Sequence, residues 1–404
     1  MFKKSIQLLF IPILLAAALN SRAQEPAAEK TPSTAVNPLI TASNAFAFDL
    51  YKQLSEKPGN IFFSPYSIDA ALAMTYEGAR GLTADEMENV LHLPKNADLR
   101  RDFFASDLAA FNAIADAGIV NAFWAQKDRV FLPAYVDLLR KNYKADAFYA
   151  DFKTAFDEAR LGINKWTAEQ TRGRIKDLFP QNSLNSLTRL VLVDAVYFKG
   201  KWTTPFDKAH TADADFFTAL RNKVKVKMMK HAGEGAKFNY CQTGVLQLLE
   251  LPYKSGGLSM LVLLPVEGGL KALESGLTPE NLAVWKKGLS NRSVDVFLPR
   301  FSLNTRYSLP GTLAKMGMSA AFTDNADFSG MDGTQELYIQ QVVHQGFVEV
   351  NEEGAEAAAA TGVSMALKSM AMPVPQFRAN RPFIFLIQET ATGKILFMGR
   401  VEKP

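Results

Sequence analysis

The sequence predicts one large domain of the α+β class. Helical patterns gather in the first half of the chain, and strand patterns follow one another in the second half with few helices between them. That order is typical of antiparallel or mixed sheets. No linker, repeat or low-complexity break follows residue 37. We therefore expect one domain over residues 38–404, although the length alone would allow two or three.

The N-terminus predicts a secretory signal peptide over residues 1–23. Lys3 and Lys4 precede an apolar run that is too short for a good membrane-spanning helix, and small residues stand at Ser21 and Ala23. A cationic start, a short apolar run and small residues before the cut are what signal peptidases recognise, so cleavage is expected after Ala23. A membrane anchor is the weaker interpretation. The signal predicts export to a periplasm, a cell surface or the medium.

Residues 24–37 are rich in Pro, Ala and Thr and predict a flexible leader. The formal net charge of the chain is +4, and loss of Lys3, Lys4 and Arg22 with the signal leaves +1. A nearly neutral chain without a basic block is a poor partner for nucleic acid. The single cysteine, Cys241, allows no internal disulfide and is expected to be a packing thiol. Stability must then come from a large apolar core.

Helices come first along the chain. Residues 39–57 have apolar residues at helical spacing, and residues 64–79 open with Ser-Pro and end beyond a Gly, as a helix should. Residues 83–93 predict a third helix with Thr83 as its N-cap. Residues 156–171 predict a fourth. Apolar runs then predict strands at residues 189–198, 245–253, 258–265, 293–303, 347–350, 383–389 and 395–401.

Motifs of catalysis and metal binding are missing from the sequence. None of its four histidines, which are His92, His210, His231 and His344, begins an HExxH pair. No GxSxG elbow, CxxC pair or phosphate-binding glycine loop follows a strand. A triad assembled in space needs no local motif, so a hydrolase stays open as a hypothesis. We expect no catalytic residue, no metal and no cofactor.

The segment "NEEGAEAAAATGVSMALKSMAMPVPQ", residues 351–376, suits no single local structure. Its alanines favour a helix, whereas its period of two predicts a strand. One phase holds only small or apolar residues from Ala355 to Met365, and the only charge, Glu356, lies on the other phase. An Ala-rich helix or loop is the alternative. A strand of this kind could enter a narrow gap between two other strands.

The hinge-like run "EEGAEAAAATGV" resembles the reactive-centre loop of serpins, the serine protease inhibitor family. Further runs are similar to the same family: "NIFFSPYSIDAALAMTYEGARGLTADEM", "INKWTAEQTRGRIKDLF", "LVDAVYFKGKWTTPFD", "LQLLELPYKSGGLSMLVLLP", "FLPRFSL" and "FRANRPFIFLI". The similarity covers residues 38–401. It implies the serpin fold, with N-terminal helices, three β-sheets including a large central mixed sheet, and an exposed reactive-centre loop at about residues 352–376.

The resemblance implies a suicide mechanism and no enzymatic activity. A protease attacks one bond of the loop and forms an acyl-enzyme. The cut loop then inserts as a new strand into the central sheet, which moves the protease and distorts it. The intact fold is metastable, held behind a kinetic barrier. Fourteen inserted residues would move the protease by about 46 Å.

The family places the cut bond fourteen residues after the hinge glycine, Gly354, which implies the bond Lys368–Ser369. A lysine there implies trypsin-like serine proteases. Met365, Leu367 and Met370 offer alternative bonds to chymotrypsin- or subtilisin-like enzymes, and cysteine proteases are further candidate partners. The hinge keeps the small residues of inhibitory members, and its residues are Glu352, Glu353, Gly354, Ala355, Glu356, Ala357, Ala358, Ala359, Ala360 and Thr361.

Other residues match the family at the place where its sheet opens. Ser64, Ser67 and His344 match directly, whereas Asp194 stands where an asparagine is usual. An Asp194–His344 pair would be charge-assisted if the imidazole is protonated. We therefore hypothesise that sheet opening depends on pH. A satisfied core histidine without a switching role is the alternative.

At the point of loop entry the resemblance marks Trp202, Arg300 and Glu352. Arg300 and Glu352 are expected to form an ion pair of modest effect if it is exposed, or to be ordinary surface charges. A monomer is expected. The alternative function is a non-inhibitory serpin, a carrier or chaperone that keeps the fold.

Overall fold

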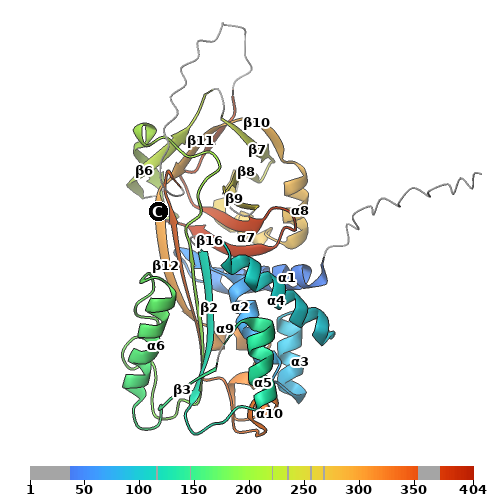
Figure 1. Cartoon of the computed structure of the whole chain (residues 1–404). Helices are drawn as coiled ribbons and strands as arrows, with labels where there is room; N and C mark the ends of the chain where they lie inside the picture. The colour runs from blue at the N-terminus through green and yellow to red at the C-terminus, as the bar shows by residue number, and fades with distance from the viewer. Residues whose placement is uncertain are drawn as a thin grey trace, which may run out of the picture. The chain divides into compact units, whose positions relative to one another are not determined.

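The computed structural model describes residues 37–353 and 374–404, apart from residues 115–116, 146, 221, 234–235, 255–256 and 267–268. The described strands form three sheets of seven, five and four strands, and helices pack against them (Figure 1). This confirms the α+β class and the large mixed sheet. No helix within these residues is long and apolar enough to span a membrane.

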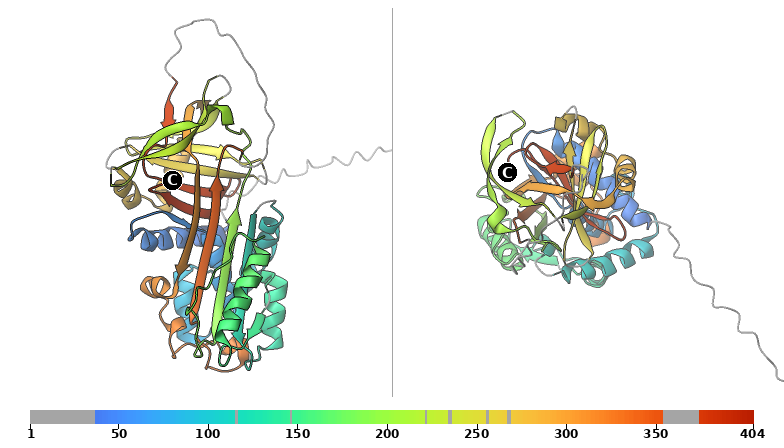
Figure 2. Two further views of the ribbon diagram at one scale, coloured as in Figure 1. Left: turned by 90° about the vertical axis from the view of Figure 1, so that its left-hand side faces the viewer. Right: turned by 90° about the horizontal axis from the view of Figure 1, so that it is seen from above.

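The five-stranded sheet contains the strands that lead to the segment of residues 351–376. β13 runs parallel to β4, and β3 runs parallel to β2, while the other neighbours are antiparallel. In the left view of Figure 2, the orange β13 lies beside the green β4. In spatial order the strands are β12 (Phe301–Ser308), β13 (Gln341–Val350), β4 (Leu190–Phe198), β2 (Ala117–Gln126) and β3 (Ala147–Ala150).

The other two sheets are built mostly from the second half of the chain. The seven-stranded sheet is β1 (Ile61–Phe63), β16 (Ile395–Val401), β15 (Phe383–Glu389), β9 (Leu258–Pro265), β8 (Leu246–Pro252), β7 (Lys237–Gln242) and β10 (Ser290–Ser293), all antiparallel. The four-stranded sheet is β14 (Gln376–Arg378), β11 (Asp295–Pro299), β6 (Lys223–His231) and β5 (Ala212–Phe217).

Helices cover both faces of the five-stranded sheet, with α6 on one side and the N-terminal helices on the other, whereas α7 and α8 lie beside the seven-stranded sheet (Figure 1). The helices of the described residues are α1 (Pro38–Ser55), α2 (Pro65–Tyr76), α3 (Gly81–Val90), α4 (Ala97–Asn112), α5 (Pro133–Leu138), α6 (Phe156–Gln170), α7 (Gly269–Ser275), α8 (Pro279–Lys287), α9 (Pro310–Met316) and α10 (Ser329–Asp332). Short π or 3₁₀ turns are η1 (Leu139–Tyr143), η2 (Lys208–His210) and η3 (Ala320–Phe322).

Strand β4 is buried on both faces, as its sequence, apolar apart from Asp194 and the hydroxyl of Tyr197, predicts. Its odd-numbered positions from Val191 to Ala195 pack in one apolar cluster with Ile163 of α6. Its even-numbered positions, including Leu192 and Val196, belong to the main core on the other face. Because side chains alternate along a strand, Asp194 faces the main core together with Leu192 and Val196.

Two local predictions were wrong. Thr83 is not an N-cap, because α3 already begins at Gly81 and the Thr83 hydroxyl accepts a hydrogen bond from the Asp327 N–H instead. The single strand expected over residues 293–303 is divided, since the chain leaves the seven-stranded sheet at Ser293, crosses the four-stranded sheet as β11 and enters the five-stranded sheet at Phe301. Apolar content predicted extended chain there but not the change of sheet.

Candidate functional site

The base of the predicted reactive segment lies at the end of β13. The chain leaves β13 at Val350, continues through Asn351 to Glu353, and returns as β14 at Gln376. Most of the predicted reactive residues lie outside the described residues: Gly354, Ala355, Glu356, Ala357, Ala358, Ala359, Ala360, Thr361, Met365, Leu367, Lys368, Ser369 and Met370. The structure therefore describes how the segment is anchored at its two ends.

Glu352 is buried at this base and paired with Arg300, which follows β11. The Glu352 side chain is 2% exposed, and its Oε1 lies 2.6 Å from Arg300 Nε and 2.5 Å from Arg300 Nη2. The Thr211 hydroxyl donates to the same carboxylate. Burial opposes ionisation, but the hydrogen bonds from Arg300 and Thr211 outweigh it and hold the pKa of Glu352 below its ordinary value. The pair is therefore more than an ordinary surface contact.

Trp202 holds the same turn through its indole and its backbone. Its Nε1–H donates to the Asn351 carbonyl at 2.9 Å, and its backbone N–H lies 3.4 Å from the Glu353 carbonyl. The ring stacks on Tyr253 with 4.5 Å between centroids, which fixes the direction of the indole N–H. The predicted entry residues Trp202, Arg300 and Glu352 are thus brought together.

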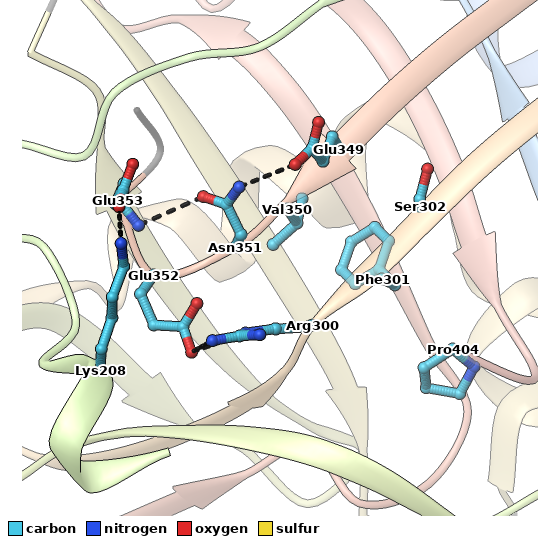
Figure 3. A pocket seen from close by; sticks show the side chains of 10 residues that line it. All are labelled: Lys208, Arg300, Phe301, Ser302, Glu349, Val350, Asn351, Glu352, Glu353 and Pro404. Atoms are coloured by element: carbon cyan, nitrogen blue, oxygen red, sulfur yellow. Dashed lines mark hydrogen bonds and ion pairs between the residues drawn. The ribbon is translucent and has the colours of Figure 1, made fainter. Parts of the chain in front are cut away.

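The stretch after Trp202 adds contacts that were not predicted. The Phe206 N–H donates to the Glu352 carbonyl at 2.9 Å, and Lys208 forms an ion pair with Glu353. Figure 3 shows Lys208 and Arg300 reaching the two glutamates from opposite sides, beside a cavity of about 690 Å³. Lys208 and Thr211 follow no sequence pattern that marks them. Only the fold brings them to the hinge.

A second cluster lies deep between β4, β13 and the start of α2. The His344 Nδ1 lies 2.8 Å from an Asp194 carboxylate oxygen, and the Ser67 hydroxyl donates to the other oxygen. Ser64 caps α2, because its Oγ accepts from the Ser67 N–H at 3.1 Å. Asp194 and His344 are both 0% exposed. The four predicted residues therefore form one buried network joining β4 and β13.

The hydrogen bonds of His344 fit one tautomer of its imidazole. Its Nε2 accepts the Ser64 backbone N–H at 3.1 Å, so the ring proton is on Nδ1, which donates to Asp194. This hydrogen bond is then strengthened by the negative charge of the carboxylate and not by a positive charge on the imidazole ring. Protonation of Nε2 would deprive the Ser64 N–H of its acceptor. If opening of the sheet depends on pH, Nε2 of His344 is the atom whose protonation would cause it. The pH dependence stays a prediction.

Glycine at position 346 allows β13 to approach this network. A Cβ there would lie 2.9 Å from the Phe62 ring, closer than real side-chain contacts, so any larger residue would push β13 away from β1.

The network contains Ser, His and Asp but lacks the arrangement of a catalytic triad. In a triad the histidine bridges the nucleophile and the carboxylate. Here the carboxylate lies between Ser67 and His344, and Nε2 is occupied by a backbone N–H. Cys241 is buried as expected, and burial raises the pKa of its thiol, the opposite of what a nucleophile requires. Neither group is built for nucleophilic attack.

Comparison with known proteins identifies the family. The family model described as "Serpin (serine protease inhibitor)" matches residues 41–404. The chain belongs to the serpin family. A serpin-like protein of Thermococcus kodakarensis is 42% identical over 91% of this chain and 86% of its own length. The human leukocyte elastase inhibitor is 39% identical over 91% of this chain and 99% of its own.

Solved serpin structures share the fold. Mouse protein Z-dependent protease inhibitor has a TM-score of 0.82 at 30% identity, covering 91% of this chain and 97% of its own. Uncleaved ovalbumin has a TM-score of 0.81 at 32% identity, and the match covers 91% of this chain and 100% of the ovalbumin chain. The predicted family and fold are therefore confirmed. Serpins are mostly inhibitors rather than catalysts, so family membership supports protease inhibition as the general activity, with proteases as partners.

Proposed function

We propose that this serpin is a suicide inhibitor that traps proteases covalently and inserts its cleaved loop between β4 and β13. The observation that carries the proposal is the pairing of these strands, which are parallel neighbours from Gln341–Val191 to Val348–Phe198, with β13 leading directly into the described hinge residues Glu352 and Glu353. A chain that leaves β13 and turns back would run antiparallel to both strands. One parallel ladder would be replaced by two antiparallel ladders, which are slightly more stable per residue.

The sequence of the segment supports the same proposal. Ala355, Ala357 and Ala359 are small residues on one phase, which lets a new strand enter a closely packed sheet. The face of β4 and β13 toward α2 is apolar around the Asp194–His344 network. Inhibition rather than transport is favoured because bulky or charged residues, which would block insertion, are absent from the hinge part of that phase, Ala355 to Thr361.

The reactive bond is proposed to be Lys368–Ser369. The protease nucleophile would attack the Lys368 carbonyl carbon, the Ser369 amine would leave with a proton, and an acyl bond to Lys368 would remain. Trypsin-like enzymes fit a lysine at this position. Met365, Leu367 and Met370 extend the candidates to proteases with apolar pockets. The name of the leukocyte elastase inhibitors adds elastase to the enzymes worth testing.

We also propose that the protein is exported and acts outside the cytoplasm, because residues 1–23 have the pattern of a signal peptide. N-terminal sequencing of the protein isolated from its native source tests this part separately, and a mature chain that begins at Gln24 is expected.

Incubation with trypsin tests the function most directly. We expect a band in denaturing gel electrophoresis at the summed mass of serpin and trypsin, because an acyl bond survives detergent. Mass spectrometry of the released C-terminal peptide is expected to begin it at Ser369. Cleavage elsewhere would overturn the assignment of the bond. Complete cleavage without any stable complex would instead support the non-inhibitory alternative, a carrier or chaperone.

A further inference from the structure

A row of three side chains crosses the four-stranded sheet next to the end of the reactive segment. Phe297 of β11 is the register partner of Arg378 on β14 and of Lys230 on β6. The neighbours Val296, Phe377 and Met229 are fully buried, whereas Lys230 is exposed and Phe297 and Arg378 are half-buried. Because side chains alternate along strands, Arg378, Phe297 and Lys230 project together from the outer face. We call them the cationic row.

Both cations of the row contact the same aromatic ring. The Arg378 guanidinium carbon lies 3.6 Å from the centroid of the Phe297 ring, and the Lys230 Nζ lies 5.9 Å from it. Cation–π attraction holds two like charges beside one ring, where they would otherwise repel each other. The two charges are therefore held in place at the surface.

The row is not neutralised by carboxylates, in contrast to the rest of β6. Lys225 pairs with Asp215 at 2.8 Å, and Lys227 pairs with Asp213 at 3.0 Å. No ion pair within the described part of the chain includes Lys230 or Arg378. Asp295, on the same strand as Phe297, accepts the Gly233 N–H at 3.3 Å. Among the described residues, positive charge is thus left without a carboxylate partner at this place in the sheet.

The place of the row relates it to the reactive segment. Arg378 is the tenth residue after Lys368, so the two are separated by no more than about 33 Å of extended chain. A protease engaged at the reactive bond can reach this end of the sheet, because that distance is comparable to the diameter of a small domain. The row is thus within reach of the rim of an enzyme's cleft.

We propose that the cationic row is a secondary contact that recognises acidic side chains around the active-site cleft of the target protease and speeds its association. This inference rests on the proposed function and specifies the chemistry of the partner. Charges at the rim of an interface act mostly on the association rate and its salt dependence. Electrostatic steering changes such rates by about 10- to 1,000-fold at low ionic strength.

Two trypsin isoforms of opposite net charge provide the test, because they share specificity for lysine. The Arg378→Glu, Lys230→Glu double variant is compared with the wild type and with a control, Lys165→Glu with Lys176→Glu. Both lysines are exposed: Lys165 lies on α6, which packs against the five-stranded sheet, and Lys176 follows that helix. The Arg378→Gln, Lys230→Gln double variant removes both positive charges without reversing them. It replaces the charge-reversed variant in the test if that variant does not fold.

The second-order rate constant of inhibition is measured at low and at high salt. We expect about 10-fold slower inhibition of anionic trypsin by the reversed variant at low salt, with the neutral variant between, and convergence of all rates at high salt. Cationic trypsin should respond in the opposite direction. The control should match the wild type for both isoforms.

Rates that change equally in the control, or do not change at all, would overturn the inference. So would an effect seen only when heparin is present, since the row would then be a polyanion site. Failure of the proposed function has a different signature, because the wild type itself would then form no detergent-stable complex with either isoform.

Discussion

Several buried residues of this protein carry carboxyl groups, and they differ in the hydrogen bonds and ion pairs that stabilise the charged form. Glu352 keeps its charge through Arg300 and Thr211, and Asp194 accepts two hydrogen bonds. Asp69 of α2 lacks such support, since it is 2% exposed and its Oδ1 has no hydrogen-bond partner within the described residues. Burial raises the pKa of this carboxyl to about 7, and the Ser43 hydroxyl of α1 opposes the rise only in part.

The raised pKa of Asp69 predicts that the intact protein loses stability as pH rises. The native state binds the proton more tightly than the unfolded chain, so the free energy of unfolding falls between about pH 4 and pH 7 and is level above. A shift of this size corresponds to about 4 kcal/mol. The Asp69→Asn variant has no ionisable group at this position, so its free energy of unfolding should not fall in this pH range for this reason.

The midpoint of the first urea unfolding transition, measured at pH 5, 6, 7 and 8, checks this prediction. The advantage of the Asn variant over the wild type should grow up to about pH 7 and then stay constant. Parallel curves for the two proteins would show that Asp69 does not titrate in the native state.

At the scale of elements, the central requirement is that the segment after Glu353 can become a strand between β4 and β13. Replacing Ala359 by Arg would place a guanidinium on the small-residue phase, where insertion would bury an unpaired charge. We expect Ala359→Arg to be cleaved as a substrate with little complex formed. The Ala359→Ser variant is the matched control, because it changes the same position without adding charge or much bulk.

Gel electrophoresis after incubation with trypsin gives the ratio of complex to cleaved serpin for both variants. A stable complex formed by Ala359→Arg as efficiently as by the wild type would mean that the inward phase is assigned incorrectly.

The elements also show where sequence reasoning succeeds. Continuous apolar runs predicted β4, β9, β15 and β16, because strands buried on both faces need such runs. Helices α4 and α5 and strands β5–β7 were not predicted. The alternating lysines of β6 were a usable signal, since Lys223, Lys225 and Lys227 are exposed. Propensity could not detect the change of sheet at Arg300.

The site was less predictable from local pattern than the fold. Ser67, Asp194 and His344 are separated by more than a hundred residues from one to the next, so only the family resemblance connected them before the structure. Thr211 and Lys208 remained hidden because a threonine and a lysine in an irregular stretch are ordinary surface residues until the fold places them beside Glu352 and Glu353. Tertiary contact, not sequence spacing, defines them.

At the scale of the whole molecule, the proposed trap works only if the folded chain can reach a lower free energy after one cut. The intact five-stranded sheet is closed by the β4–β13 ladder and by contacts at Glu352 and Glu353. Insertion would add a strand to this sheet and bury its small residues. If the intact protein reaches that state only slowly, as proposed, its persistence is a matter of rate rather than of equilibrium.

The thermal unfolding of intact and loop-cleaved protein is the measurement that tests this most directly. The two forms differ by one peptide bond, and their unfolding can be followed by circular dichroism under the same conditions. We predict that the cleaved form unfolds only at about 90 °C or above, the range of hyperstable proteins, and that the intact form unfolds far below it. Equal midpoints, or a less stable cleaved form, would contradict the account.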